Sequence, residues 1–399
     1  MATVAIIAEY NPFHSGHEYQ INKIREIFGK DTSIIAIMSG NYTQRGEIAF
    51  ADKLTRATSA VLGGVNLVLE LPFPYSMSSA EVFAKSAVFI ASKLGCVDYL
   101  VFGSESGDIE EIAYVTEILS SKKFNINFKE LNSDKSIGYA KRLELAYKKT
   151  ADKFRGFEFT SNNILALEYV KALKTYKSKI IPFTLKRNGA EYNSEKTSDD
   201  KAHQSATAIR KLFFTTPEDA LKYIPINCRD FLKNSFYENE FPYVEEKLAP
   251  AVIYNLRLSS SADVPDAAQG LYNRLINASF EASSISSLLS LTETKKYTNA
   301  RIKRVVWYGF IGVTSSDLKS TPLFTQVLAM DSVGMRELKI IRKKSEISVL
   351  TKPSDYSHFD DIAIRQKKMS ERADSVFELA CPKPKSGRTA LRLTPFVKK

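Results

Sequence analysis

Cysteine, histidine and long apolar segments are scarce in this chain of 399 residues. The three cysteines, Cys96, Cys228 and Cys381, lie far apart, so they provide neither a disulfide framework nor a Cys-x-x-Cys metal site. A structural zinc would need other ligands, and the chain has only four histidines. No apolar run reaches about 18 residues, which argues against a transmembrane helix. No basic segment precedes the apolar run at the N-terminus, which argues against a signal peptide. These absences predict a cytoplasmic protein with no membrane partner.

Acidic residues are outnumbered in only one part of the chain. Residues 290–399 hold 22 lysines and arginines against 11 aspartates and glutamates, so they carry the whole net charge of +11. Segregated positive charge of this kind is typical of a module that binds a polyanion. An inert, solvated basic surface would explain the same count, because lysine-rich surfaces are common.

Apolar periodicity divides the chain into two parts. In the first part, short β-branched runs alternate with segments of helical periodicity. The predicted strands are 3–8, 33–38, 66–71, 99–102 and 180–184, and the predicted helices are 15–29, 52–63, 78–94 and 162–174. This alternation predicts an α/β domain over residues 1–212, with a Rossmann-like, doubly wound parallel sheet. Strand-like runs thin out from residue 213, which predicts a mostly helical, basic domain over 213–399.

Polar residues follow the predicted strands, in clusters at 10–17, 39–47, 103–106 and 187–189. The carboxyl ends of parallel strands meet at one edge of a sheet, where ligands bind in folds of this class. The sequence therefore predicts a single ligand site at that edge.

Two of the four histidines stand in one tetrapeptide, His14-Ser15-Gly16-His17, between the first strand and the first helix. Free backbone N–H groups and the helix dipole favour phosphate at such a position, and Gly16 would allow close approach of a ligand. His14 and His17 are expected to donate to triphosphate oxygens and to stabilise charge that develops at the α-phosphate. Two histidines with a purely structural role in the turn are the alternative, and a zinc pair lacks a third ligand.

His-x-Gly-His after a first strand resembles the signature of the HIGH nucleotidyltransferase superfamily. The segment 205–210 resembles the second signature of that superfamily, which contacts the triphosphate, although Gln204 and Ala206 depart from it. Hydroxyl groups and an arginine at a helix start can bind pyrophosphate as it leaves. The expected phosphate contacts are Ser205, Thr207 and Arg210. An ordinary capped helix start is the alternative.

Further segments narrow the resemblance to the tRNA(Met) cytidine acetate ligase family. They are residues 8–17, 38–41, 44–47, 70–72, 102–105 and 162–165, with a looser likeness at 296–304. The resemblance implies that acetate is activated with ATP as acetyl-adenylate. It further implies that the acetyl group passes to N4 of the wobble cytidine (position 34) of elongator tRNA(Met).

The same resemblance implies a set of ATP contacts. These are Ile7, Ala8, Glu9, Tyr10, Asn11, Pro12, Phe13, His14, Ser15, Gly16, His17, Glu18, Tyr19, Gln20, Gly103, Asn162, Arg187 and Asn188. Asn163 adjoins Asn162, and the sequence does not decide which of the two contacts ATP. A Mg²⁺ ion is expected on the phosphates, but the sequence names no protein ligand for a metal.

Two more groups of residues have open roles. Gln44, Arg45 and Glu47 lie in a loop that is expected to anchor acetate, the phosphates or the cytidine, or to form a local surface ion pair. The expected tRNA contacts are Lys295, Lys296, Arg301, Lys303 and Arg304. Trp307 is expected to pack inside the helical domain rather than to stack on a base.

Two other functions use the same residues. A small-molecule adenylyltransferase would share the histidine site but would not need the basic last quarter. A non-catalytic RNA-binding protein would keep only an ATP-shaped pocket.

Overall fold

A computed structural model describes residues 1–399 except 132–137, 153–155, 188–203, 261–262, 269, 295, 353, 384, 389–391 and 399. Two of the predicted site residues, Asn188 and Lys295, lie outside the described residues. Among the described residues, no helix is long and apolar enough to cross a membrane.

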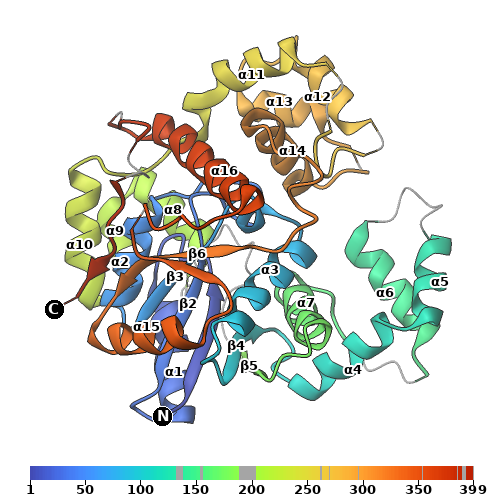
Figure 1. Ribbon diagram of the computed structural model, residues 1–399. Helices are drawn as coiled ribbons and strands as arrows, with labels where there is room; N and C mark the ends of the chain where they lie inside the picture. Colours follow the sequence, from blue (N-terminus) through green and yellow to red (C-terminus); the bar gives the residue numbers. More distant parts are fainter. Residues whose placement is uncertain are drawn as a thin grey trace.

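A central sheet of eight strands organises the molecule (Figure 1). The strands are β1 (Thr3–Ala8), β2 (Ser33–Ser39), β3 (Leu67–Leu71), β4 (Tyr99–Ser104), β5 (Ile181–Lys186), β6 (Phe324–Met330), β7 (Ser348–Leu350) and β8 (Phe396–Val397). Their order is β5-β4-β1-β2-β3-β6-β7, and β8 also pairs with β6. Strands β1 to β5 run parallel, which confirms the predicted doubly wound α/β fold.

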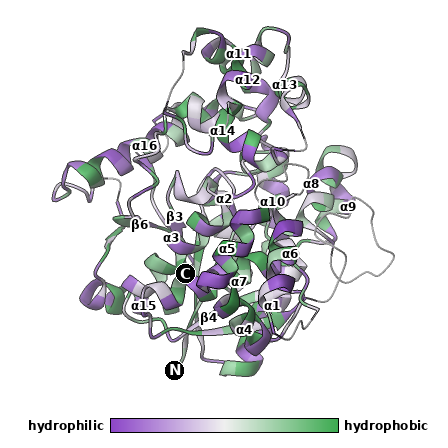
Figure 2. Ribbon diagram, turned by 90° about the vertical axis from the view of Figure 1, so that its right-hand side faces the viewer, coloured by the Kyte–Doolittle hydropathy of each residue, from purple (hydrophilic) through white to green (hydrophobic). Residues whose placement is uncertain are grey.

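Helices cover both faces of the sheet. Alternate residues of each strand point to opposite faces, and apolar side chains on both faces are buried under helices. On β1, Val4 and Ile6 belong to the same core as Ile21 of α1, whereas Ala5 packs with Val88 of α3 in a second core. The helices of the first half are α1 (Ser15–Phe28), α2 (Lys53–Leu62), α3 (Ala80–Lys93), α4 (Ile109–Leu119), α5 (Lys122–Glu130), α6 (Tyr139–Thr150), α7 (Ser161–Thr175) and α8 (Ala206–Thr215). Hydrophilic and hydrophobic residues alternate along these helices, as expected for elements with one buried face (Figure 2).

The second half of the chain is mostly helical, as predicted. Its helices are α9 (Pro217–Leu221), α10 (Ile226–Tyr237), α11 (Ala249–Leu258), α12 (Leu271–Ser279), α13 (Ile285–Thr292), α14 (Asn299–Ile311), α15 (Ser332–Lys344) and α16 (Asp361–Phe377). Helices α11 to α14 gather at one end of the molecule, and α4 to α6 form another group beside the sheet (Figure 1).

The second half also completes the sheet, which the sequence analysis did not foresee. Strand β6 pairs antiparallel with β3, and β7 and β8 pair with β6. The apolar pattern of β6 is interrupted by Thr325 and Gln326, although both side chains are buried. Thr325 is satisfied there by donating from Oγ1 to the carbonyl oxygen of Glu70 at 2.7 Å. A division of the chain at 212/213 therefore separates β6 from the strand with which it pairs.

Candidate nucleotide-binding site

The predicted histidine turn lies at the start of α1, and each histidine accepts a backbone hydrogen bond. His14 is the N-cap residue, and its Nδ1 accepts from Gly16 N at 3.1 Å. His17 Nδ1 accepts in return from His14 N at 3.2 Å, which completes a capping box. A neutral imidazole whose Nδ1 accepts must carry its proton on Nε2. Each ring therefore offers an Nε2–H donor.

The two imidazoles of this pair lie close together. The two ring centroids are 3.9 Å apart, and His14 is buried. Burial, and then the nearby charges of His14 and Arg187, hold the pKa of His17 well below its usual range. His17 is thus neutral at physiological pH, and the arrangement supplies a hydrogen-bond donor rather than a proton source.

The turn that leads to His14 is fixed by its own buried side chains. Phe13 is fully buried, and a Cβ placed on Gly63 would lie 2.2 Å from its ring, so this position admits only glycine. Asn11 Oδ1 accepts from Phe50 N at 2.8 Å, and the Asn11 carbonyl oxygen accepts from Arg210 Nη1 at 2.8 Å. Tyr10 is also buried, so Tyr10, Asn11 and Phe13 shape the turn with side chains that point into the protein.

A buried arginine, which the sequence analysis did not single out, joins the carboxyl ends of β1 and β2. Arg56 is 1% exposed, and its Nη1 donates to the carbonyl oxygens of Glu9 at 2.6 Å and Ser39 at 3.1 Å. Its Nη2 donates to the Gly40 carbonyl, and its Nε donates to the Ala51 carbonyl at 2.8 Å. Burial lowers the pKa of Arg56 to about 10, so it stays charged. Arg56 therefore fixes the spacing between the histidine turn and the loop after β2.

A second buried group of charges anchors the loop after β2. Lys53 Nζ lies 2.8 Å from Glu70 Oε1 on β3 and 2.7 Å from Asp374 Oδ2 on α16. Asn41, at the base of the loop, donates from Nδ2 to Asp374 Oδ1 at 2.8 Å and accepts from Lys53 N at 2.7 Å. The charges of the two carboxylates raise the pKa of Lys53 against the opposing effect of burial. Helix α16 is thereby tied to the sheet beside the site.

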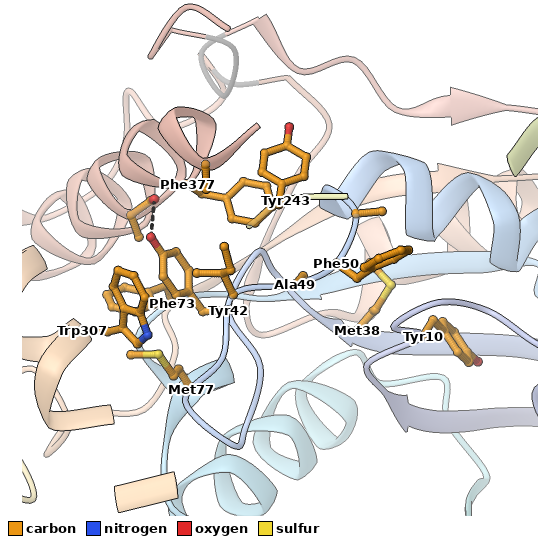
Figure 3. Close-up of a cluster of buried hydrophobic side chains, with 14 of the residues drawn as sticks. Tyr10, Met38, Tyr42, Ala49, Phe50, Phe73, Met77, Tyr243, Trp307 and Phe377 are labelled. Carbon is orange, nitrogen blue, oxygen red and sulfur yellow. Dashed lines mark hydrogen bonds between the residues drawn. The ribbon is translucent and has the colours of Figure 1, made fainter. Parts of the chain in front are cut away.

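A cluster of buried aromatic side chains surrounds Tyr42 (Figure 3). Tyr42, one residue beyond Asn41, donates from its hydroxyl to the Ala373 carbonyl at 3.0 Å. Its ring makes edge contacts with Trp307 and Phe377, with centroids 5.9 and 6.2 Å apart. Trp307 is 1% exposed, so it packs within the protein as expected.

The opposite wall of the site comes from β4, β5 and α7. A Cβ on Gly103 would lie 3.1 Å from Arg187 Cγ, so the Arg187 side chain lies directly over that glycine. Asn163 is 2% exposed, and its Oδ1 accepts from Glu105 N at 3.0 Å and Ser106 N at 3.1 Å. Asn162 is half-buried and donates to the Glu105 carboxylate at 2.5 Å. The geometry thus assigns Asn163 to the support of the loop, whereas Asn162 lies nearer the surface and is bonded to Glu105.

Helix α8 brings the segment 205–210 to the histidine turn. Ser205 is the N-cap, and its Oγ accepts from Ala208 N at 3.1 Å. Arg210 Nη2 lies 3.3 Å from Thr207 Oγ1, while its Nη1 holds the Asn11 carbonyl. The structure therefore places Arg210 next to the turn that contains His14.

The loop after β2 faces the same space. Gln44 N donates to Glu9 Oε1 at 2.8 Å, which links the loop to the end of β1. Burial raises the pKa of Glu9, although this hydrogen bond and the charges of Arg45 and Arg210 act to lower it. Glu47 pairs with Lys303 of α14 at 2.8 Å. Glu47 is thus tied to the second half of the chain through α14.

The chain is similar to known proteins over most of its length. A model of the HIGH Nucleotidyl Transferase family matches residues 1–390. A tRNA(Met) cytidine acetate ligase from Caldanaerobacter subterraneus subsp. tengcongensis is 37% identical over 391 residues, which cover 95% of this chain and 96% of that protein. The chain belongs to the tRNA(Met) cytidine acetate ligase family.

Other family members give the same result. A tRNA(Met) cytidine acetate ligase from Clostridium tetani is 38% identical, with 88% of this chain and 90% of that protein covered. Crystal structures of Thermotoga maritima TmcAL are 26% identical and match all of both chains, with a TM-score of 0.91 for the apo form. The form bound with alpha-thio ATP has a TM-score of 0.89.

The basic residues of this family member are partly engaged inside the protein. Arg304 is buried and pairs with Asp266 at 2.9 Å, and Arg301 donates from Nε to the Asp266 carbonyl at 2.8 Å. Lys296 is exposed. Among the described residues, no group of three His, Cys, Asp or Glu side chains is arranged to hold a metal ion.

Proposed function

We propose that the protein is an ATP-dependent ligase that acetylates N4 of the wobble cytidine (position 34) of elongator tRNA(Met). The observation that carries this proposal is the histidine pair at the start of α1, in which His17 is neutral, placed beside Arg210 and within the field of Arg187. Membership of the tRNA(Met) cytidine acetate ligase family and the fold shared with an ATP-analogue complex support it.

The first step joins acetate to ATP. An acetate oxygen attacks the α-phosphorus, the bond to the β-phosphate oxygen breaks, and acetyl-adenylate and pyrophosphate form. His14 and His17 donate from Nε2 to the phosphate oxygens, where negative charge builds up in the transition state. Arg210, with Ser205 and Thr207, holds the β- and γ-phosphates as they leave. Gly103 and Asn162 receive the adenosine, and Arg187 lies over that part of the site.

The second step transfers the acetyl group. The N4 amine of the cytidine attacks the carbonyl carbon, the bond to the AMP oxygen breaks, and the amine loses a proton.

A Mg²⁺ ion held mainly by phosphate oxygens and water would neutralise triphosphate charge. Lys296, Arg301 and Lys303 are the proposed contacts with the tRNA backbone. Arg304 is buried against Asp266 and supports this surface from inside instead. Because tRNA is a cytoplasmic substrate, we place the enzyme in the cytoplasm.

Acetate-dependent exchange of labelled pyrophosphate into ATP tests the first step. We expect exchange with the wild-type protein and at least a tenfold loss with His17→Ala, the size expected when a preorganised donor is removed. Lys23→Met, a change in an exposed ion pair on the same helix, serves as the control. Exchange that is unchanged in His17→Ala would show that the site is wrongly assigned. Exchange that does not require acetate would favour another adenylyltransferase.

A further inference from the structure

A chain of charges crosses the mouth of the candidate site. Lys303 of α14 donates to Glu47 Oε1 at 2.8 Å, and Glu47 Oε2 lies 3.7 Å from Arg210 Nη2 of α8. The three side chains are 18, 34 and 22% exposed, so a ligand can reach each of them. Glu47 thus stands between a cation of the helical half and a cation of the α/β half.

Glu47 is held against α14 by the backbone of its own loop. Gly46 has a φ of +77°, and a Cβ there would lie 2.7 Å from Arg304 N, so the loop rests directly on α14. Burial would raise the pKa of Glu47, but the charge and hydrogen bond of Lys303, followed by the charges of Arg210 and Arg45, lower it. Glu245 is a second acidic neighbour of Lys303. Glu47 is therefore ionised, and Lys303 is its closer partner.

Arg210 has two kinds of partner that compete for one guanidinium group. Its Nη1 holds the Asn11 carbonyl, whereas Nη2 faces Thr207 and Glu47. In the proposed function, Arg210 also holds the leaving pyrophosphate. A carboxylate that pairs tightly with Arg210 weakens that hold, because carboxylate and phosphate oxygens use the same donors.

We propose that Lys303 and Glu47 form a relay that couples the RNA side of the site to the triphosphate side; this inference rests on the proposed function. While Lys303 holds Glu47, Arg210 is available to the triphosphate. An RNA phosphate that draws Lys303 away leaves Glu47 to pair with Arg210, which loosens the grip on pyrophosphate. Lys303 and Glu47 are positioning residues in this scheme, since both act through Arg210. Linkage requires the reverse effect as well, so bound triphosphate weakens RNA binding.

The relay predicts that two variants act in opposite directions. Lys303→Met releases Glu47 onto Arg210 and should raise the KM for ATP in acetate-dependent pyrophosphate exchange by about two- to fivefold, the size of a half-exposed ion pair. Glu47→Gln frees Arg210 and should lower this KM. In the double variant, Lys303→Met should have no further effect. Lys233→Met, which removes a lysine from a surface ion pair on α10 at 3.2 Å from Glu218, provides the matched control.

RNA supplies the second readout. Adding a tRNA(Met) anticodon stem-loop should raise the KM for ATP of the wild-type protein and should not raise that of Glu47→Gln. A purely structural role for Glu47 would make both single variants worse, with effects that add in the double variant, and this result would overturn the relay. Absence of acetate-dependent exchange in the wild-type protein would instead refute the proposed function itself, so the two failures are distinguishable.

Discussion

Removal of the Lys53 ammonium group should destabilise the protein more than any surface charge change. Lys53→Met would leave Glu70 and Asp374 buried without the cation that lies 2.8 and 2.7 Å from them. Removing one partner from a buried ion pair costs about 3–5 kcal/mol, because a charge is left uncompensated. Lys23 makes an ion pair of similar length, 2.7 Å to Glu26, but Glu26 is exposed and Lys23 is about one-third exposed. Lys23→Met should therefore change the free energy of unfolding by less than about 0.5 kcal/mol.

The loss in Lys53→Met should also depend on pH. Burial already raises the pKa of Glu70, and Lys53 is the largest opposing influence, so its removal raises this pKa further. The folded variant then binds more protons than the unfolded chain, and its stability falls as the pH rises. The deficit relative to the wild-type protein should thus be smaller at pH 5.5 than at pH 8.

Urea unfolding measures both effects. The single tryptophan, Trp307, is buried beside Tyr42, so its fluorescence reports on this part of the structure, and circular dichroism reports on the whole. A Lys53→Met variant no less stable than Lys23→Met, or a deficit that grows at low pH, would refute the assignment of these charges as a mutually compensating group.

Three further predictions concern the site. Because the pKa of His17 is lowered while an unfolded histidine titrates near ~6.5, the free energy of unfolding should fall as the pH drops below about 6.5. His17→Gln should reduce that slope in urea titrations at several pH values. Asn162→Ala should raise the KM for ATP about three- to tenfold with little change in stability, whereas Asn163→Ala should lower the urea midpoint because it removes the support of Glu105 N and Ser106 N. Gly46→Ala should cost about 1–3 kcal/mol in urea unfolding, since φ is +77° and its Cβ would meet Arg304 N; an unaffected variant would show that the loop does not rest on α14.

Local patterns in the sequence were sufficient to predict much of the fold. The five parallel strands follow from short apolar runs, and the histidine turn follows from two imidazoles beside a glycine at a helix start. Strand β6 escaped prediction because Thr325 and Gln326 break its apolar pattern, and Thr325 is satisfied only by a hydrogen bond to β3. Periodicity along the chain does not reveal a partner so distant in sequence.

The same limit applies to the site. Nothing near Arg56 in the sequence indicates that its guanidinium group binds the carbonyl oxygens at the ends of two strands. Lys53 and Asp374 are 321 residues apart, and Glu47 and Lys303 are 256 residues apart. Asn162 and Asn163 were indistinguishable as neighbours in the sequence, and their different burial and hydrogen bonds separate the two only in the folded structure.

The most direct test of the proposed function follows labelled acetate to its product. The purified protein is incubated with ATP, labelled acetate and unfractionated tRNA, and the RNA is then digested to nucleosides. The proposal predicts label in N4-acetylcytidine from position 34 of elongator tRNA(Met), and none when ATP is omitted or when His17→Ala replaces the wild-type protein. Label that appears in another nucleoside, or only in a small molecule, would contradict it.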